Sequence, residues 1–486
     1  MSHAGPGTGP QGADRPDDVA PGGDPLPVST HASKAGSTPA TTGNTASATP
    51  PALPSWGNHP QAAPARVQAL HWRDEPLPTP ASAAPMLARG NGRSYGDVGL
   101  NHGGTVLLTR GLDRVIAFDC QRGILRCEAG ILLDRLLELT VPQGWLLPVL
   151  PGTAQVTVGG AIGNDIHGKN HHQAGSFGCH VRAFELLRSD GTRLECSPDH
   201  HAELFAASIG GLGLTGLITW VELQLVPVPG PWLLATDTRF TGWDAFHELS
   251  RAHAAAQYTV AWLDALVPSG QPWRGVFSHG DFAALDDGPA PPKARAGVPF
   301  TPPLCLPRAG AVRVLNGQRW RRARTDPAPV HYRRFFFPLD AIGHWNRLYG
   351  RRGFVQHQCV LPPQVAIDSL VQIQATIAAS GQPPLLAVAK TFGPLASPGL
   401  LSFPRPGTTL ALDFPFRGEP TVALLAHLDA IVAEAGGAVY PAKDAHLSGA
   451  HFRQFFPAWQ RFCPLVDPAF SSSFWRRVMA DAKPPP

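Results

Sequence analysis

LPGTAQVTVGGAIGNDIHGKNHHQAGSFG, from Leu150 to Gly178, is the stretch that decides the fold prediction, because glycine and small side chains dominate it. A second glycine-rich stretch, RGNGRSYGD, runs from Arg89 to Asp97. Glycine has no Cβ, so main-chain N–H groups in such loops can turn toward a ligand and approach it closely, as in loops that hold a pyrophosphate. Either stretch alone is explained equally well as a structural turn. Two of them close together in the sequence favour a phosphate-bearing ligand.

The segments around these loops alternate between strand-like and helix-like patterns. ILLDRLLEL, from Ile131 to Leu139, has the apolar spacing of a helix, and Pro142 with Gly144 predicts its end. LITWVELQLV, from Leu217 to Val226, alternates as a strand does. Further strands are predicted at Val106–Leu108, Val115–Phe118 and Ala183–Leu187, and a short helix at Ala202–Ile209. Because strands and helices do not repeat regularly, we expect an α+β fold rather than a doubly wound sheet.

Length and composition indicate a folded chain of two or three domains. The chain has 486 residues, of which 43% are hydrophobic and 16% charged, and its formal net charge is +4. That net charge is too small to predict nucleic-acid binding. Seven cysteines occur at irregular spacing without a Cys-x-x-Cys pair, which is typical of free thiols in a reducing compartment.

No targeting or membrane-spanning segment is expected. The start of the chain lacks a basic region followed by an apolar run, so we predict no signal peptide. No apolar stretch reaches the ~20 residues that cross a bilayer. We therefore expect a cytoplasmic protein and leave open a peripheral contact with the inner face of the membrane. Residues 1–55 consist largely of Pro, Gly, Ala, Ser and Thr, so we predict a disordered, low-complexity extension there.

Two other motifs are given little weight. Gly211–Gly216 matches G-x-G-x-x-G, but a dinucleotide site needs a strand before that motif and a helix after it, and here the predicted order is reversed. His167, His171 and His172 lie close together on a glycine-containing loop, yet no second ligand cluster accompanies them. We therefore predict no metal site, and we interpret His171 and His172 as hydrogen-bonded loop side chains.

Three strings together resemble the FAD-binding domain of the vanillyl-alcohol-oxidase superfamily, and within it the decaprenylphosphoryl-β-D-ribose 2′-oxidases. They are GRSYGD (Gly92–Asp97), the Leu150–Gly178 stretch and GGLGLTG (Gly210–Gly216). The similarity extends over roughly residues 60 to 480 through AWLDA (Ala261–Ala265), WNRLYG (Trp345–Gly350), FVQHQCVLP (Phe354–Pro362), KTFGP (Lys390–Pro394), LSFPRPG (Leu401–Gly407), DFP (Asp413–Pro415) and YPAKD (Tyr440–Asp444).

The resemblance implies a divided architecture. A two-subdomain PCMH-type FAD-binding domain would be built from residues 56–228 and 438–486, and residues 229–437 would form an inserted α+β substrate-binding domain. The rise in Pro and Gly around Pro227–Pro231 agrees with the first boundary. Within the inserted region we expect a long irregular insertion from Gly280 to Pro329.

The resemblance also implies that FAD is the cofactor. Related members link FAD covalently through a histidine in an Arg-Gly-x-Gly-His-Ser loop. Arg93 occupies that position here, and a guanidinium cannot form the bond, so we predict non-covalent FAD. The implied cofactor contacts are Gly90, Asn91, Gly92, Arg93, Ser94, Tyr95, Gly96, Asp97, Val98, Gly152, Thr157, Val158, Gly159, Gly160, Asn164, Asp165, Ile166, His167, Ile218 and Tyr440.

Lys443 matches the family's active-site lysine. A lysine acts as a base only when burial or nearby positive charge lowers its pKa. We predict that Lys443 orients the reacting hydroxyl and accepts its proton, and that His167 is a second contact of the hydroxyl or the flavin. A plain surface position is the alternative for Lys443. The implied substrate contacts are Lys169, Trp262, Phe336, Gln356, Gln358, Lys390 and Ala411, and a packing role stays open for each of them.

Two positions depart from the family pattern. Ala411 stands where the family commonly has a cysteine that covalent inhibitors exploit, so we predict insensitivity to nitroaromatic compounds of that class. Phe336 stands where a tyrosine is often found, which removes a hydroxyl from the predicted pocket. The second departure affects the expected identity of the substrate.

The predicted function is oxidation of a sugar hydroxyl, namely the 2′-hydroxyl of a polyprenylphosphoryl-ribose, to a keto sugar. A partner reductase would complete an epimerisation. The alternatives are a sugar-alcohol or aldonolactone oxidase with a soluble substrate, and a non-catalytic flavin-binding protein. Arg308–Arg352 holds eleven arginines and only two acids, Asp326 and Asp340. This segment is either a solvated basic surface or a patch that meets a phosphate-bearing lipid or an anionic membrane.

Overall fold

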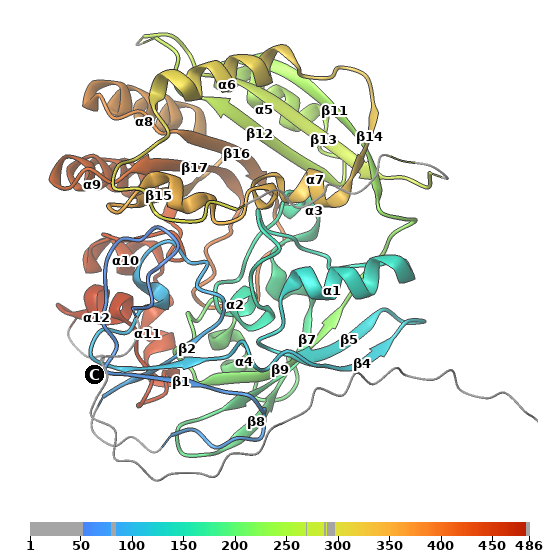
Figure 1. Ribbon diagram of the computed structural model, residues 1–486, viewed down its shortest axis with the longest axis vertical. Helices are drawn as coiled ribbons and strands as arrows, with labels where there is room; N and C mark the ends of the chain where they lie inside the picture. Colours follow the sequence, from blue (N-terminus) through green and yellow to red (C-terminus); the bar gives the residue numbers. More distant parts are fainter. Residues whose placement is uncertain (1–51, 79–83, 269, 286–287, 289–296, 483–486) are drawn as a thin grey trace, which may run out of the picture. The chain divides into compact units, whose positions relative to one another are not determined.

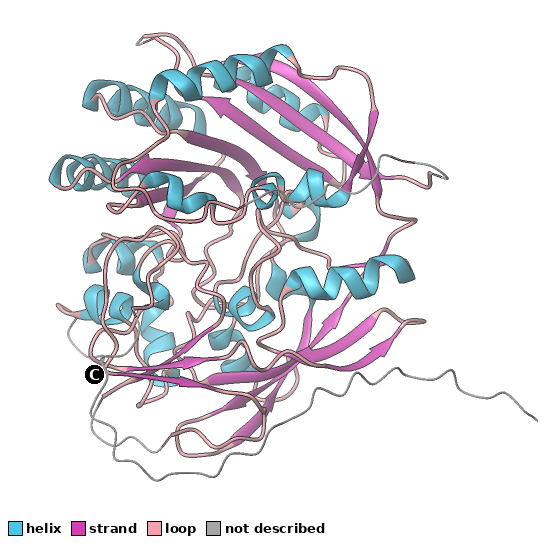
Figure 2. Ribbon diagram, in the orientation of Figure 1, coloured by secondary structure: helices cyan, strands magenta, loops and turns pink. Residues whose placement is uncertain are grey.

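The strands of the described residues form four sheets. The first glycine-rich loop joins β2 to β3 within one sheet, and the second glycine-rich stretch lies between β6 and β7. The computed structural model describes residues 52–78, 84–268, 270–285, 288 and 297–482, all of which belong to the unit Pro50–Pro486. Helices and strands follow one another without a fixed repeat, which confirms the predicted α+β class (Figure 2). The extension predicted to be disordered, residues 1–55, lies outside the described residues except for 52–55. No helix in the described part of the chain combines the length and apolar character needed to cross a bilayer.

The strands before and after the Leu150–Gly178 stretch in the sequence form an antiparallel sheet of five strands. Helices α1 (Leu133–Thr140) and α2 (Val158–Gly163) lie over one face of it (Figure 1). Leu136 and Ile162 of these helices share a core with Val221 of the sheet, so the apolar positions of the helical pattern are the ones that are buried. The strand order is β4 (Val115–Asp119), β5 (Ile124–Glu128), β9 (Leu217–Gln224), β7 (Val181–Leu187) and β8 (Arg193–Cys196).

A small parallel sheet leads into the first glycine-rich loop. Its strands pair in the order β1 (Arg66–Ala69), β3 (Thr105–Leu108) and β2 (Met86–Arg89). Because β2 ends at Arg89, the glycine-rich loop that starts at Gly90 follows directly after the end of this strand. A two-stranded pairing of β6 (Trp145–Leu146) and β10 (Val226–Pro227) lies elsewhere in the unit.

The largest sheet is antiparallel and has eight strands. Helices α5 (Trp243–Ala252), α8 (Ala366–Ser380) and α9 (Glu419–Glu434) share one core with it, to which Ala387 and Leu410 contribute. The strand order is β14 (Ala328–His331), β11 (Trp232–Thr241), β13 (Arg274–Phe282), β12 (Tyr258–Asp264), β16 (Leu386–Phe392), β17 (Gly407–Pro415), β15 (Phe354–Leu361) and β18 (Ala438–Val439). Successive side chains on a strand point to opposite faces, so the other face of β15–β17 is free to carry polar groups.

The C-terminal segment returns to the start of the described chain. The Ser471 N–H donates to the Met86 carbonyl at 2.9 Å, and the Ser473 N–H donates to the Leu100 carbonyl at 2.8 Å. This segment contains α10 (Gly449–Phe455), α11 (Trp459–Phe462) and α12 (Ser473–Met479). The remaining helices are α3 (His171–Ala174), α4 (Ala202–Ser208), α6 (Ala309–Arg321) and α7 (Tyr332–Phe336), with 3-10 turns at Asp97–Gly99, Val141–Gln143, Phe177–His180, Pro338–Ala341, Trp345–Tyr349 and Cys463–Leu465.

The predicted elements around the loops are confirmed, and the expected irregular insertion is wrong. Helix α6 lies inside the segment 280–329 that was predicted to be irregular. Its anchor is polar, because the Asn316 amide donates to Asp264 at 2.8 Å while Val314 and Leu315 are exposed. A helix held in this way has no apolar stripe, so the pattern that indicates a helix was absent.

Candidate active site

A cavity of about 560 Å³ lies between the glycine-rich loops and the polar face of the large sheet. Alternate residues of three neighbouring strands form one wall, which follows from the two-residue period of a strand. These residues are Gln356 and Gln358 on β15, Leu386, Val388 and Lys390 on β16, and Thr409 and Ala411 on β17. The turn that contains Tyr440 and Lys443 closes one end.

The two glycine-rich stretches face the sheet and contact each other. A Cβ on Gly90 would lie 2.2 Å from Thr157 Oγ1, so only glycine allows this approach. The Asn91 side-chain amide donates to the Gln155 carbonyl at 2.7 Å. The structure therefore brings together two loops that are separated in the sequence by β3, β4, β5 and α1.

The first glycine-rich loop presents a run of main-chain donors. Among the hydrogen bonds of the described residues, none is donated by the N–H of Asn91, Gly92, Arg93 or Ser94. These residues line the cavity, and Gly92 has a positive φ of 60°. Consecutive N–H groups in a turn form a concave anion site, which suits a pyrophosphate.

The second glycine-rich stretch contributes an unsatisfied acceptor. The Asn164 amide donates to the Gly160 carbonyl at 2.8 Å, and the Tyr440 hydroxyl donates to the Asn164 carbonyl at 2.8 Å. Asn164 Oδ1 is buried and has no donor among the described residues. A buried acceptor of this kind is costly unless a ligand supplies the donor.

Lys443 extends into the cavity from a tight turn. Its ammonium nitrogen lies 3.6 Å from the ring centroid of Tyr95, and the Tyr95 N–H donates to the Ala442 carbonyl at 2.9 Å. Burial lowers the pKa of Lys443, and the negative charge of Asp413 opposes that change. The lysine is therefore closer to neutrality at physiological pH than an exposed lysine would be.

Asp413 is the acid whose negative charge acts on Lys443. Its carboxylate is fully buried on β17, and Gln356 donates to Oδ1. Oδ2 has no partner among the described residues. Burial raises the pKa of Asp413, while the Gln356 hydrogen bond and the charge of Lys443 lower it. The charge states of Lys443 and Asp413 therefore depend on each other.

His167 is held between two polar side chains of the sheet. Its Nε2 lies 2.8 Å from the Gln358 amide nitrogen, and its Nδ1 lies 3.1 Å from Lys390 Nζ. Burial, followed by the charge of Lys390, places the pKa of His167 well below its ordinary value, so the ring is neutral. Burial and the charge of Lys443 lower the pKa of Lys390 to about 7.

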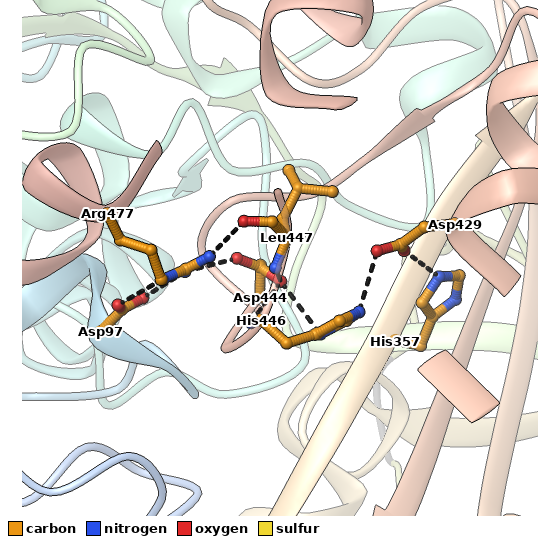
Figure 3. A network of polar contacts seen from close by, with 7 residues as sticks. All are labelled: Asp97, His357, Asp429, Asp444, His446, Leu447 and Arg477. Carbon is orange, nitrogen blue, oxygen red and sulfur yellow. Dashed lines mark hydrogen bonds and ion pairs between the residues drawn. The ribbon is translucent and has the colours of Figure 1, made fainter. Parts of the chain in front are cut away.

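A buried ionic network supports the turn that carries Lys443 (Figure 3). The carboxylate of Asp444, the next residue, accepts the N–H groups of His446 and Leu447 at 3.0 and 2.9 Å. Arg477 of α12 pairs with both Asp444 and Asp97 at 2.7 Å. The lysine turn, the first glycine-rich loop and the C-terminal helix are therefore tied to one guanidinium.

Comparison with known proteins identifies the family. A family model described as an FAD binding domain matches residues 80–197. The decaprenylphosphoryl-beta-D-ribose oxidase of Mycolicibacterium smegmatis is 38% identical over 412 residues, which cover 81% of this chain and 89% of that protein. The chain belongs to the decaprenylphosphoryl-β-D-ribose oxidase family.

Two further relatives differ in coverage. An uncharacterized protein of Streptomyces coelicolor is 37% identical over 373 residues, which cover 72% of this chain and 100% of that protein. The L-gulonolactone oxidase of Mus musculus is 36% identical over 140 residues, which cover 28% of this chain and 31% of that protein. These comparisons confirm two predictions for this member of the decaprenylphosphoryl-ribose oxidase family, since its cofactor is FAD and it is an FAD-dependent oxidoreductase.

The cavity fits that cofactor. The N–H groups of the 91–94 loop would suit its diphosphate, and the orphaned Asn164 Oδ1 would accept a hydrogen bond from a donor on the cofactor. Glycines on three segments, such as Gly92, Gly160 and Gly213, line the cavity, where they add no side chains to its wall. In this decaprenylphosphoryl-ribose oxidase family member, the G-x-G-x-x-G segment at 211–216 follows α4 and precedes β9, as predicted, and its Gly213 and Gly216 line the cavity.

Most of the predicted site residues line this cavity. They are Gly90, Asn91, Gly92, Arg93, Ser94, Tyr95, Gly96, Val98, Gly152, Thr157, Gly159, Gly160, Asn164, Ile166, His167, Ile218, Gln356, Gln358, Lys390, Ala411, Tyr440 and Lys443. Six others, namely Asp97, Val158, Asp165, Lys169, Trp262 and Phe336, lie elsewhere.

Two of these six are carboxylates that support the loops. Asp97 pairs with Arg477 rather than facing the cavity. Asp165 is fully buried, where Ser397 and Ser402 each donate to Oδ2 at 2.6 Å. Both were predicted to contact the cofactor, and both instead fix the backbone next to residues that line the cavity.

The predicted aromatic walls of the pocket are also placed differently. Phe336 is 1% exposed and packs in the core edge-on to Tyr258, with ring centroids 4.8 Å apart. Trp262 lies under the guanidinium of Arg319, whose Cζ is 5.3 Å from the ring centroid. Neither residue lines the cavity. A phenylalanine in place of tyrosine at position 336 therefore does not remove a hydroxyl group from the cavity wall.

The last two residues are held by local packing. Val158, the first residue of α2, is fully buried in the core that this helix shares with the five-stranded sheet. Lys169 donates to the Phe335 carbonyl and lies over its ring at 4.5 Å. Burial, followed by the charge of Lys390, lowers the pKa of Lys169 to about 7.

The sequence reasoning assigned no role to Asp413, Thr409 or Trp345. Thr409 accepts from Gln358 at 3.1 Å, and Trp345 lines the far side of the cavity. A usable signal existed for the first two, because Asp413 and Thr409 alternate with Ala411 on one strand and so share its face. Trp345 is on a 3-10 turn, for which no such periodicity applies.

Proposed function

We propose that the chain oxidises the 2′-hydroxyl of a polyprenylphosphoryl-ribose to a keto sugar, as the first half of an epimerisation. One observation carries this proposal: Lys443 lines the cavity beside Tyr95 of the first glycine-rich loop, and burial lowers its pKa while the charge of buried Asp413 opposes that change. The name of the Mycolicibacterium smegmatis relative supplies the sugar and the lipid.

The residues of the chain have separable tasks. When bound, FAD supplies the two-electron acceptor for the hydride that leaves the sugar carbon. Lys443 in its neutral form accepts the hydroxyl proton at Nζ, so the carbon loses a hydride and the oxygen a proton. Asp413 stabilises the ammonium that results. Neutral His167 lines the cavity and, with both ring nitrogens engaged by Gln358 and Lys390, holds these two side chains at the polar wall.

The arrangement of segments supports a split cofactor domain. We assign residues 56–228 and 438–486 to the FAD-binding domain and residues 229–437 to the substrate-binding domain. The contacts of Ser471 and Ser473 with Met86 and Leu100 support joining the two ends of the chain. The eight-stranded sheet supplies Gln358 and Lys390 to the cavity, in keeping with a substrate role for the middle region.

The cofactor is proposed to be bound without a covalent link. The Cζ of Arg93 lies 4.1 Å from the ring centroid of Trp56, at the position where covalent relatives use histidine. Acid precipitation tests this assignment: a colourless pellet and a yellow supernatant are expected, and flavin retained in the pellet refutes it.

Two alternative functions are separated from the proposal by one experiment. The similarity to L-gulonolactone oxidase covers 28% of the chain and so bears on the shared flavin region alone. Anaerobic reduction of the bound flavin is followed with farnesylphosphoryl-ribose, free alditols and aldonolactones. Bleaching by the first compound is expected. Bleaching by the soluble sugars alone indicates a soluble-sugar oxidase, and bleaching by none of them indicates a non-catalytic flavoprotein.

The proposed reaction needs a reductase partner and access to a lipid. A keto sugar is an intermediate in an epimerisation, so a reductase must consume it. Helix α6 exposes Val314 and Leu315 beside arginines such as Arg321, which favours a peripheral contact with an anionic membrane. Flotation with liposomes tests that contact, and equal binding to neutral and anionic vesicles contradicts an electrostatic role.

A further inference from the structure

A second cavity, of about 320 Å³, adjoins the first. Seven residues line both cavities, namely Ser55, Trp56, Arg89, Asn91, Gly92, Arg93 and His344. Thr301 and Arg347 line the second cavity alone. A group attached to a ligand in the first cavity can therefore extend past Arg93 into the second.

The second cavity has positive side chains without carboxylate partners. Arg347 donates to the carbonyls of Val298 and Pro299, both at 2.8 Å, and Arg93 donates to the Gln155 carbonyl at 3.4 Å. Neither arginine takes part in an ion pair within the described residues. A guanidinium that is partly removed from water without an acid favours an anionic ligand.

The nearby charges support this interpretation. Desolvation, followed by the positive charges of Arg347 and Arg93, lowers the pKa of His344, so the three groups share one electrostatic environment. The negative charge of Asp340 acts on Arg93 and raises its pKa against the effect of burial. The Asp340 carboxylate accepts a hydrogen bond from the Ala154 N–H at 2.9 Å. Three arginines, Arg89, Arg93 and Arg347, and no carboxylate line the second cavity among the described residues.

An apolar surface begins where the second cavity ends. The segment 298–306 passes Arg347, and the Leu306 N–H donates to the Leu348 carbonyl at 2.8 Å. Along this segment the side chains of Phe300, Leu304 and Leu306 are 68%, 73% and 56% exposed. Three large apolar side chains exposed on one short segment suit an apolar ligand or surface.

We propose that the second cavity binds the phosphate of the lipid-linked substrate, with Arg347 and Arg93 as its partners, and that the isoprenoid chain leaves over Phe300 and Leu304. This inference rests on the proposed function, and it adds the anionic subsite that would separate a lipid phosphate from a soluble sugar. The diphosphate of FAD is the other source of phosphate in this protein. Its N–H donors lie on the 91–94 loop, and Asn91, Gly92 and Arg93 of that loop line both cavities. Arg347, on the turn Trp345–Tyr349, lines the second cavity alone, so the affinity for FAD of a variant at Arg347 distinguishes the two phosphates.

Binding of farnesyl phosphate to the FAD-loaded protein tests the subsite without any turnover. Calorimetry compares the natural chain with Arg347→Gln, which removes the charge, and Arg347→Lys, which keeps it. We expect about tenfold weaker binding for Arg347→Gln and a smaller loss for Arg347→Lys. Arg135→Gln is the matched control, because Arg135 is exposed, lines neither cavity and pairs with Glu138. Unchanged binding by Arg347→Gln overturns the proposal.

Three further measurements separate the remaining explanations. The affinity for FAD, measured by fluorescence, should be unchanged in Arg347→Gln, and a loss of FAD affinity overturns the proposal by assigning the arginine to the cofactor. Farnesol should bind more weakly than farnesyl phosphate and be insensitive to Arg347→Gln. If Arg347→Gln does not fold, Phe300→Ser provides the test, because this position is exposed. Phe300→Ser should bind farnesyl phosphate more weakly than the natural chain does and bind inorganic phosphate equally well. Equal affinity of the natural chain and Phe300→Ser for farnesyl phosphate overturns the proposed path of the isoprenoid. Farnesyl phosphate has no sugar, so these results are independent of whether any sugar reduces the flavin.

Discussion

The ammonium nitrogen of Lys443 lies 3.6 Å from the ring centroid of Tyr95, a residue of the first glycine-rich loop. The Tyr95 N–H is bonded to the Ala442 carbonyl, so both the side chains and the main chains of the two segments are in contact. A ring face attracts an ammonium, which limits the positions that Nζ can take. The proposed base is therefore held by the same loop that suits the cofactor phosphates.

Replacement of Lys443 by alanine should remove chemistry and keep the cofactor. We expect flavin reduction by substrate to slow about 10²- to 10⁴-fold, the usual contribution of a positioned base. FAD should stay bound, because its proposed contacts lie mainly on the glycine-rich loops. Stopped-flow reduction and fluorescence titration measure the two effects. Lys443→Arg keeps the positive charge but not the base, so activity near the natural rate in that variant contradicts the role of Lys443 in proton transfer.

Asp413→Asn should shift the pH dependence of flavin reduction. The charge of Asp413 raises the pKa of Lys443, so removing it lowers the lysine pKa further. A lysine with a lower pKa is neutral at lower pH, and the acidic limb of the rate profile should move toward lower pH, by about one pH unit. The measurement is the limiting reduction rate between pH 5 and 10. If the acidic limb does not move while FAD stays bound, the charge of Asp413 does not influence the pKa of the base, and the prediction is wrong.

The sequence indicates the cofactor loops well because their requirement is local. Glycine at positions such as Gly90 and Gly92 follows from close approach and a positive φ, and both constraints act within one short segment. The neighbouring strands and helices have the simple periodicities of two and 3.6 residues, so they too could be predicted. Helix α6 could not, because it is held to the sheet by polar and cation–π contacts, such as Asn316 with Asp264 and Arg319 with Trp262, rather than by an apolar stripe.

The far wall of the site was harder to predict because it depends on strand register. Gln358 pairs with Ala411 across β15 and β17, and Ala411 pairs with Val388 across β17 and β16. Sequence alone does not give that register, so Asp413 went unassigned although it is two residues from Ala411. Phe336 was misplaced for a related reason, since three consecutive phenylalanines leave the choice between cavity and core to tertiary packing.

Arg477→Ala should destabilise the whole unit. Arg477 holds two buried carboxylates, Asp97 and Asp444, and truncation would leave Asp97 without an ion-pair partner and Asp444 with His446 alone. Loss of one partner of a buried pair costs about 3–5 kcal/mol of unfolding free energy. Urea denaturation of the holoenzyme measures the change. Arg135→Ala, which removes an exposed pair with Glu138, should cost about 0–1 kcal/mol, and equal losses for the two variants contradict a structural role for the network.

His446→Gln should reveal the same network through pH. Burial alone lowers the pKa of His446, but its contact with Asp429 at 2.9 Å and the charge of Asp444 outweigh burial and raise that pKa. A group whose pKa is raised by folding stabilises the folded state fully below its unfolded pKa, about 6.5 for histidine, and loses that contribution as the pH rises through the folded pKa.

The pKa of Asp429 is lowered, because its contacts with His357 and His446 outweigh burial, so this carboxylate stays charged across that range. The difference in unfolding free energy between the natural chain and His446→Gln should therefore be larger at pH 5.5 than at pH 9. His200→Gln, at an exposed loop position, provides the control and should show no such dependence. A difference that grows with rising pH would mean that His446 is neutral in the folded protein, and the ionic link between α9 and the lysine turn would then be absent.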